Sequence, residues 1–122
     1  MLTRYRDIAP YITKDGSVIR ELMHPAVHGN NAQSLAEATL ASGAVTASHV
    51  HHAAEELYHV TRGSGRMTLG SETFDVGPGD TVCIPPGVAH CIENTGLGEL
   101  AVLCCCAPAY SHEDTVLTGG NA

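Results

Sequence analysis

The stretch HVHHAAEELYHVTRG, residues 49–63, holds four of the chain's eight histidines and two adjacent glutamates. In an extended strand successive side chains point to opposite faces, so His49 and His51 share a face that excludes His52. Two imidazoles roughly 6–7 Å apart on one face can converge on one metal ion, because each metal–nitrogen bond adds about 2 Å of reach. This pattern predicts a metal site on a strand, with His49 and His51 as two of the ligands. If the strand is bulged, His52 takes the place of His51.

Two adjacent glutamates follow the histidines and offer a further ligand. If residues 55–60 form the next strand, Glu56 and Tyr58 share one of its faces. Glu55 then lies on the opposite face with His59. Alternation by itself does not choose between the two glutamates.

The spacing of these residues resembles the first motif of the cupin superfamily. Written out, it is Gly43-x5-His49-x-His51-x4-Glu56-x6-Gly63. In the cupin motif six residues separate the glutamate from the closing glycine. The resemblance therefore selects Glu56, since Glu55 would need seven.

A second stretch, Gly79-x5-Pro85-x-Gly87-x2-His90-x3-Asn94, is similar to the second cupin motif, and residues 64–78 separate the two motifs. The resemblance implies that one metal ion is held inside a jelly-roll barrel by His49, His51, Glu56 and His90. Three neutral imidazoles and one carboxylate suit Mn, Fe, Ni, Cu or Zn better than Mg or Ca. We therefore expect one divalent transition metal ion as the cofactor.

Strand and turn signals dominate the chain from about residue 35 onward. Short alternating or apolar segments end at Gly or Pro at intervals of roughly 8–12 residues, which is typical of a β-sandwich or barrel. Residues 65–76 are expected to form a hairpin that turns near Gly70-Ser71. This pattern, with the resemblance, predicts an all-β chain: a cupin double-stranded β-helix, or jelly-roll barrel, with an N-terminal strand arm.

The expected organisation is one domain with three parts. Residues 1–34 form an N-terminal arm, with strands near Ile12 and at 18–22, which joins the sheet or a dimer partner. Residues 35–110 form the cupin barrel, and residues 111–122 form a polar C-terminal tail. Because an N-terminal strand crosses to a second subunit in many small cupins, the arm favours a homodimer.

Tyr58 is the candidate catalytic residue. It shares a face with Glu56 and would act as a proton donor or base beside the metal; filling of the barrel is the alternative. His52 and His59 are expected to lie at the surface or to contact the metal ligands without binding the metal.

The three consecutive cysteines at 104–106 invite a separate metal hypothesis. Cys104 and Cys106 lie roughly 6–7 Å apart on one face, whereas sulfurs that share a zinc ion are about 4 Å apart. We therefore expect small buried apolar side chains, and the same for Cys83 and Cys91. One of the five cysteines could line the cavity.

Six basic residues against 13 acidic ones give a net charge of −7, which opposes binding to the phosphates of nucleic acids. No apolar run reaches the length of about 18 residues that suggests a membrane span. The first residues lack the apolar core of a signal peptide, so a cytoplasmic location with reduced thiols is expected.

The resemblance specifies the site better than the reaction, because cupins include dioxygenases, decarboxylases, isomerases, lyases, polyketide cyclases and sugar-binding sensors. We expect a metal-dependent enzyme that acts on an oxygen-rich anionic small molecule, with dioxygenase-type chemistry favoured. One alternative is a non-redox metal-dependent isomerase, lyase, decarboxylase or cyclase. The other is a module that binds or senses a metabolite without catalysis.

Overall fold

The computed structural model describes residues 1–119, and strands dominate this part of the chain. The strands are β1 (Tyr11–Ile12), β2 (Val18–Met23), β3 (Ser34–Leu40), β4 (His49–His51), β5 (Glu55–Arg62), β6 (Gly65–Leu69), β7 (Glu72–Val76), β8 (Thr81–Ile84), β9 (His90–Asn94), β10 (Leu100–Ala107) and β11 (Thr115–Leu117). Two short helical segments accompany them, the 3-10 turn η1 (Tyr5–Asp7) and α1 (Pro25–His28). The predicted all-β class is confirmed.

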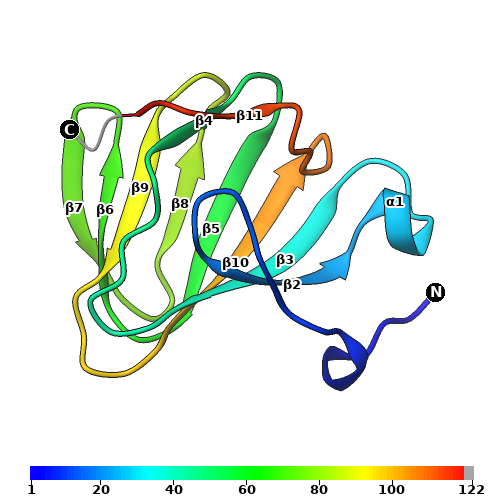
Figure 1. Cartoon of the computed structure of the whole chain (residues 1–122), viewed down its shortest axis with the longest axis horizontal. Coiled ribbons are helices and arrows are strands. Elements are labelled where there is room, and N and C mark those ends of the chain that lie inside the picture. The colour runs from blue at the N-terminus through cyan, green and yellow to red at the C-terminus, as the bar shows by residue number, and fades with distance from the viewer. Residues whose placement is uncertain (120–122) are drawn as a thin grey trace.

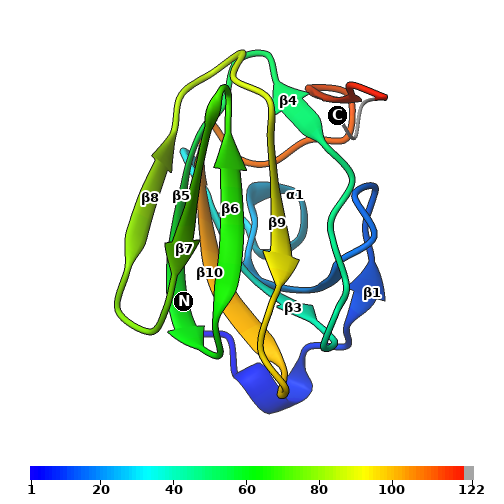
Figure 2. The ribbon, with the colours of Figure 1, turned by 90° about the vertical axis from the view of Figure 1, so that its left-hand side faces the viewer.

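The strands form two antiparallel sheets that face each other (Figures 1 and 2). The six-stranded sheet has the order β1-β2-β3-β10-β5-β8, and the five-stranded sheet has the order β11-β4-β9-β6-β7. Neighbours in the sheets are often far apart in sequence, as with β3 and β10, which pair from Leu40↔Leu100 to Ser34↔Cys106. This interleaving lets residues from distant segments meet between the sheets.

The core lies between the sheets because inward and outward side chains alternate along the strands. In β5, Tyr58 and Val60 are buried while Leu57 and His59 are exposed. Met67 on β6 and Leu100 on β10 have no exposed surface. Each fully buried side chain of this size contributes about 1.5–3 kcal/mol to folding.

The predicted hairpin at residues 65–76 is confirmed. Strands β6 and β7 pair with Leu69 opposite Glu72, which leaves Gly70-Ser71 as the two-residue turn. Gly70 has a φ of 60°, a left-handed conformation that glycine adopts without steric cost.

Gly63, the last residue of the first motif, stands where the chain passes close to another backbone segment. Its φ is +85°, and a Cβ added there would lie 2.6 Å from the carbonyl oxygen of Glu99. Both the conformation and the space therefore require glycine at this position.

The N-terminal arm joins the six-stranded sheet of its own chain (Figure 1). Strand β1 pairs with β2, and β2 pairs with β3 with a bulge between Glu21 and Met23. The strands predicted near Ile12 and at residues 18–22 are thus present.

Strand β11 lies within the segment predicted as a polar tail, and it pairs with β4 through Thr115↔His51. Residues 120–122 of that tail lie outside the described residues. Among residues 1–119, no helix is long and apolar enough to cross a membrane.

The outer face of the six-stranded sheet carries a row of four apolar side chains in register. Leu35, Cys105, Leu57 and Cys83 are successive partners across β3, β10, β5 and β8. The prediction that Cys83 is buried is wrong, because the alternation of β8 turns Val82 and Ile84 inward and leaves Cys83 exposed. Cys91 is only half-buried, as is Cys105.

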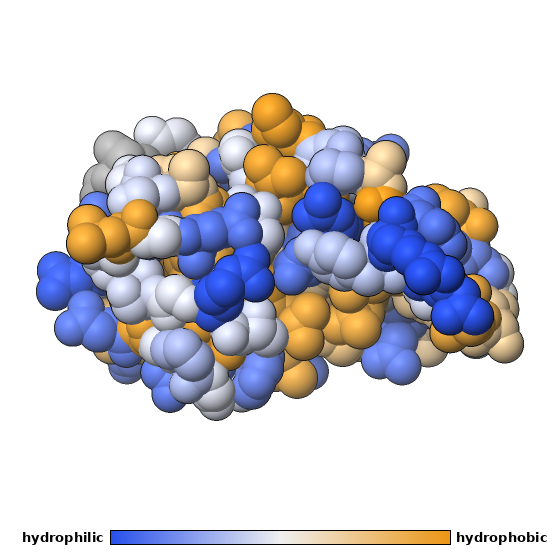
Figure 3. All heavy atoms as spheres, turned by 90° about the horizontal axis from the view of Figure 1, so that it is seen from below, coloured by the Kyte–Doolittle hydropathy of each residue, from blue (hydrophilic) through white to orange (hydrophobic). Residues whose placement is uncertain are grey.

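Polar side chains cover much of the face seen in Figure 3, with exposed apolar side chains in patches between them. Exposed apolar residues are normal on a folded chain, because polar surface is too scarce to cover it.

Candidate metal centre

Four side chains from three strands converge between the two sheets. His49 and His51 come from β4, Glu56 from β5 and His90 from β9. One potential ligand atom of each lies within 4.8 Å of all the others, and all four residues are buried. The residues that the sequence predicts as metal ligands are thus brought together at one point.

The strand pairing explains how His90 reaches this point. His90 is the direct partner of His49 where β9 pairs with β4, and their ring centroids are 4.2 Å apart. In the turn before β9, the backbone N–H of Gly87 donates to the carbonyl of His51 over 2.8 Å. Gly87 has a φ of 81°, which explains the glycine of the second motif.

Backbone carbonyls set the protonation of two of the imidazoles. Nδ1 of His49 lies 2.8 Å from the carbonyl oxygen of Ala47, and Nδ1 of His90 lies 3.1 Å from that of Val88. A carbonyl only accepts hydrogen bonds, so each Nδ1 carries the proton. In the neutral rings Nε2 then bears a lone pair, the form in which histidine binds a metal.

The third imidazole is oriented in the same way by a residue of β11. The hydroxyl of Thr115 donates to the carbonyl oxygen of Ser111 over 2.8 Å. Its oxygen is therefore left to accept from Nδ1 of His51, 2.9 Å away. The hydrogen bonds thus leave Nε2 of His51 without a proton as well.

A metal ion fits this donor set. Nε2 of His90 is buried and has no hydrogen-bond partner in the part of the chain that the structure describes. Nε2 of His51 lies 3.0 Å from Oε1 of Glu56, and in its neutral tautomer it has no proton to donate to that oxygen. A buried polar atom without a partner costs about 1–3 kcal/mol. One cation between the three nitrogens and the carboxylate satisfies all four groups.

The electrostatics keep these groups in their metal-binding forms. Burial alone raises the pKa of Glu56. Hydrogen bonds and charge from His51 and His90, when these rings also carry a proton on Nε2, outweigh burial and bring that pKa down to about 2, and a metal cation in place of those protons favours the carboxylate in the same way. Burial, followed by the neighbouring His90, lowers the pKa of His49. Near neutral pH the carboxylate is therefore ionised and the His49 imidazole is neutral.

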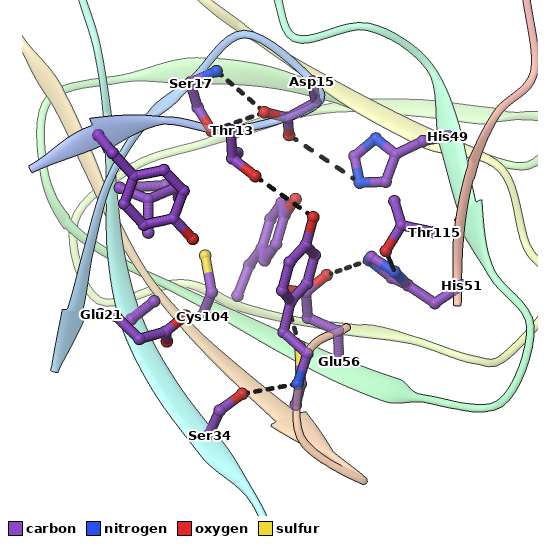
Figure 4. A pocket seen from close by; sticks show the side chains of 17 residues that line it. Thr13, Asp15, Ser17, Glu21, Ser34, His49, His51, Glu56, Cys104 and Thr115 are labelled. Atoms are coloured by element: carbon purple, nitrogen blue, oxygen red, sulfur yellow. Dashed lines mark hydrogen bonds and ion pairs between the residues drawn. The ribbon is translucent and has the colours of Figure 1, made fainter. Parts of the chain in front are cut away.

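A cavity opens beside the cluster (Figure 4). Small side chains on β3 and β10 leave the space: Ala36, Ala38 and Cys104 line it. The centres of water-sized molecules can reach about 50 Å³ of it. This is more than one water molecule needs, so a small ligand has room next to the cluster.

Tyr58, the predicted catalytic residue, also lines this cavity. Its ring centroid lies 5.9 Å from that of His90. Burial, and then the negative charge of Glu56, raise the pKa of Tyr58 well above its ordinary value. Its phenol is therefore protonated near neutral pH and can donate a hydrogen bond to a molecule in the cavity.

The other histidines of the opening motif lie outside the cluster. His52 is exposed in the bend that follows β4. His59 is exposed as well, and its Nδ1 lies 2.8 Å from the hydroxyl of Thr81. The strand is thus not bulged in the way that would bring His52 into the place of His51.

Cys104 and Cys106 are buried, as expected, and they share a face of β10 that lines the cavity. The thiol of Cys106 donates to Oε2 of Glu56 over 3.3 Å. Burial raises the pKa of Cys104 and of Cys106 far above the ordinary value of a thiol, so both are protonated.

Several cavity residues were not found from the sequence. Thr115 and Tyr110 come from the C-terminal part of the chain, and Asp15 and Glu21 come from the N-terminal arm. Oδ2 of Asp15 lies 3.9 Å from Nε2 of His49. The alternation of side chains in the arm could have indicated these residues, because the odd-numbered residues from 11 to 21 all line the cavity. The sequence does not show which strand the arm pairs with, so the direction of this face could not be predicted.

Two comparisons with solved structures support the fold. The chain is similar to a predicted oxalate decarboxylase from Thermotoga maritima, with a TM-score of 0.78 and 24% identity over 88% of this chain and 99% of that one. It is also similar to Pac13 of Streptomyces, described as a nucleoside dehydratase, with a TM-score of 0.75 and 18% identity over 95% of this chain and 92% of that one.

A closer relative exists among known sequences. An uncharacterized protein of Methanocaldococcus jannaschii, MJ1618, is 53% identical over 113 residues, which cover 93% of this chain and 90% of that protein. The model of the cupin domain family matches residues 36–106, which include both motifs and all four clustered residues. The chain therefore belongs to the cupin family.

Proposed function

We propose that this cupin is a metal-dependent enzyme in which His49, His51, Glu56 and His90 hold one divalent transition metal ion. The observation that carries the proposal is the orientation of the three imidazoles. Each Nδ1 has a hydrogen-bond acceptor behind it, so three lone pairs converge with one carboxylate on the same point. Histidines that only fill a core have no need of this common orientation.

The substrate in this proposal is a small oxygen-rich molecule in the adjacent cavity. The ion would supply a Lewis acid that binds and polarises an oxygen of the substrate. A divalent ion with one carboxylate ligand keeps a net charge of +1, which favours as the donor an oxygen that carries negative charge when bound, such as the enolate or phenolate of a substrate that is neutral when free. Tyr58, protonated and within the same cavity, is positioned to donate a proton or a hydrogen bond to that molecule.

Dioxygenase-type chemistry is the first reaction class to test, because imidazole and carboxylate ligands suit the redox metals Fe, Mn, Ni and Cu in addition to Zn. A non-redox reaction, such as isomerisation or decarboxylation, is the second candidate. In it the ion would stabilise an enolate, and Tyr58, which lines the same cavity, would donate a hydrogen bond to the substrate. The two solved relatives share one fold but are named for different reactions, so the fold alone does not indicate which reaction this chain catalyses.

Metal analysis of protein purified without chelator or immobilised metal tests the proposal. We expect close to one transition metal ion per chain, and its loss in His49→Ala and His90→Ala. Glu72→Gln, on the exposed β6–β7 hairpin, is the control for a surface change. Well-folded protein without metal, or variants that keep the metal, would show that the cluster is not a metal centre.

Oxygen consumption measured with a substrate that is turned over then separates the two reaction classes. A ligand that is retained tightly without turnover would indicate a binding or sensing module in place of an enzyme.

A further inference from the structure

The wall of the cavity facing the metal centre is built by the N-terminal arm. Six alternate residues of this hairpin line the cavity: Tyr11, Thr13, Asp15, Ser17, Ile19 and Glu21. Because strand side chains alternate in direction, one hairpin face supplies this whole wall. We call these six residues the arm wall.

The hairpin tip is held in place against the segments that carry the metal ligands. The backbone carbonyl of Asp15 accepts from the N–H of Ala47 over 2.8 Å, two residues before His49. The ammonium of Lys14 donates to the carbonyls of His112 and Thr115 over 2.9 and 2.7 Å. The arm wall is therefore a fixed part of the site.

Two carboxylates of the arm wall have oxygens that the protein does not use. Oδ1 of Asp15 accepts from the backbone N–H and the hydroxyl of Ser17, at 2.9 and 2.7 Å. Oδ2 faces His49 and has no hydrogen bond with any residue from 1 to 119. Oε1 of Glu21 is buried and also has no hydrogen-bond partner within that range. Figure 4 shows Glu21 across the cavity from His49. Such oxygens need hydrogen-bond donors.

The cavity lining contains no positive side chain to pair with a negative group of a ligand. None of the seventeen described lining residues is Lys or Arg. A divalent ion would bring two positive charges, and Glu56 and Asp15 together offset them. A ligand carboxylate that pointed toward Glu21 would meet a second carboxylate with no cation between them.

We infer that the arm wall selects a small neutral polyhydroxylated molecule, whose hydroxyl groups donate to Asp15 and Glu21 while another of its oxygens faces the metal. This inference deepens the proposed function and rests on it. The arm wall excludes dicarboxylates, because their second charge has no partner there.

Binding of small probes to the zinc-loaded protein tests this assignment without any assay of turnover. Dihydroxyacetone and erythritol serve as neutral probes and malonate as the dicarboxylate, each titrated by ligand-observed NMR. We expect at least one neutral probe to bind about tenfold more tightly than malonate. Glu21→Gln and Asp15→Asn should each reduce the ratio of the affinity for the neutral probe to the affinity for malonate about fivefold or more. The amide that replaces the carboxylate accepts weaker hydrogen bonds from hydroxyl groups and no longer repels a carboxylate.

Glu72→Gln is the matched control, since it removes an exposed carboxylate that does not line the cavity and should leave the ratio of the two affinities unchanged. Tighter binding of malonate than of both neutral probes, absence of neutral binding, or an unchanged ratio in both arm-wall variants would each overturn the inference. Zinc content is measured on the same samples. A wild-type protein that takes up no zinc refutes the metal centre itself, whereas zinc uptake with the wrong selectivity refutes only the arm-wall assignment.

Discussion

The thiol of Cys106 donates a hydrogen bond to Oε2 of Glu56 over 3.3 Å, while the other carboxylate oxygen, Oε1, lies 3.0 Å from Nε2 of His51. Both Cys106 and Glu56 are buried. The contact joins β10 to β5 at the register pair Cys106↔Glu56 and holds the carboxylate with one oxygen turned toward the histidines.

Cys106→Ala should therefore weaken metal binding about tenfold, because groups that orient a ligand tune its affinity for the metal. Cys106→Ser keeps a donor and should bind metal nearly as well as the wild type. Competition with a chelator measures the affinities, and Cys105→Ala, on the outer face of the same strand, serves as the control. Equal affinities in Cys106→Ala and the wild type would show that the thiol does not position Glu56.

Thr115→Val should weaken metal binding about 10–100-fold, because it removes the acceptor that keeps the proton of His51 on Nδ1. The His51 ring is then free to take the other tautomer. Nitrogen NMR shifts of the His51 ring report the tautomer directly, and chelator competition reports the affinity. Thr118→Val, which removes an exposed hydroxyl bonded to Ser48, is the matched control. A ring that keeps its tautomer in Thr115→Val would contradict this role.

Gly63→Ala should destabilise the fold by about 1–3 kcal/mol, because alanine is strained at positive φ and its Cβ would collide with the backbone. The φ of Gly63 is +85°, and the carbonyl oxygen of Glu99 stands 2.6 Å from the Cβ position. Urea denaturation measures the free energy of unfolding. Gly98→Ala is the control, since nothing lies within 4 Å of its Cβ position. An equal decrease in the free energy of unfolding in the two variants would argue against a special role for Gly63.

Glu21 should make the metal-free protein less stable as the pH rises. Burial raises the pKa of Glu21 in the folded state, so between its unfolded and folded pKa values the folded chain binds more protons. Stability then falls as pH increases through that window. Glu21→Gln should be more stable than the wild type at pH 7 and nearly equal to it at pH 4. We expect a gain below about 1 kcal/mol, because the Glu21 side chain as a whole is only partly buried and solvent screens its charge.

Urea denaturation of both proteins at the two pH values measures this difference, with Glu72→Gln as the exposed control. A Glu21→Gln gain that is as large at pH 4 as at pH 7 would show that the effect does not come from the charge.

The clustered residues could be predicted from sequence because two regularities act together. Strand alternation puts His49 and His51 on one face, and the resemblance supplied Glu56 and His90 from other segments. Thr115 could not be found in this way, because its role depends on the register Thr115↔His51 between strands far apart in the chain.

The exposed position of Cys83 was missed for a related reason. Its segment reads as apolar throughout, and only the observed register shows that Val82 and Ile84 take the inward positions. Asp15 and Glu21 could not be predicted as cavity residues either, because the sequence does not distinguish a polar residue that faces a cavity from one that faces solvent.

The arm wall and the metal cluster come from separate stretches of the chain, residues 11–21 and residues 49–90. The four clustered side chains all lie outside the arm, and Asp15 is the arm-wall residue whose carboxylate faces one of them, His49. Specificity can therefore change at the other inward positions of the arm while the metal ligands stay the same, and an engineer who wishes to change what this cupin accepts could vary those positions and keep Asp15 and the hairpin tip.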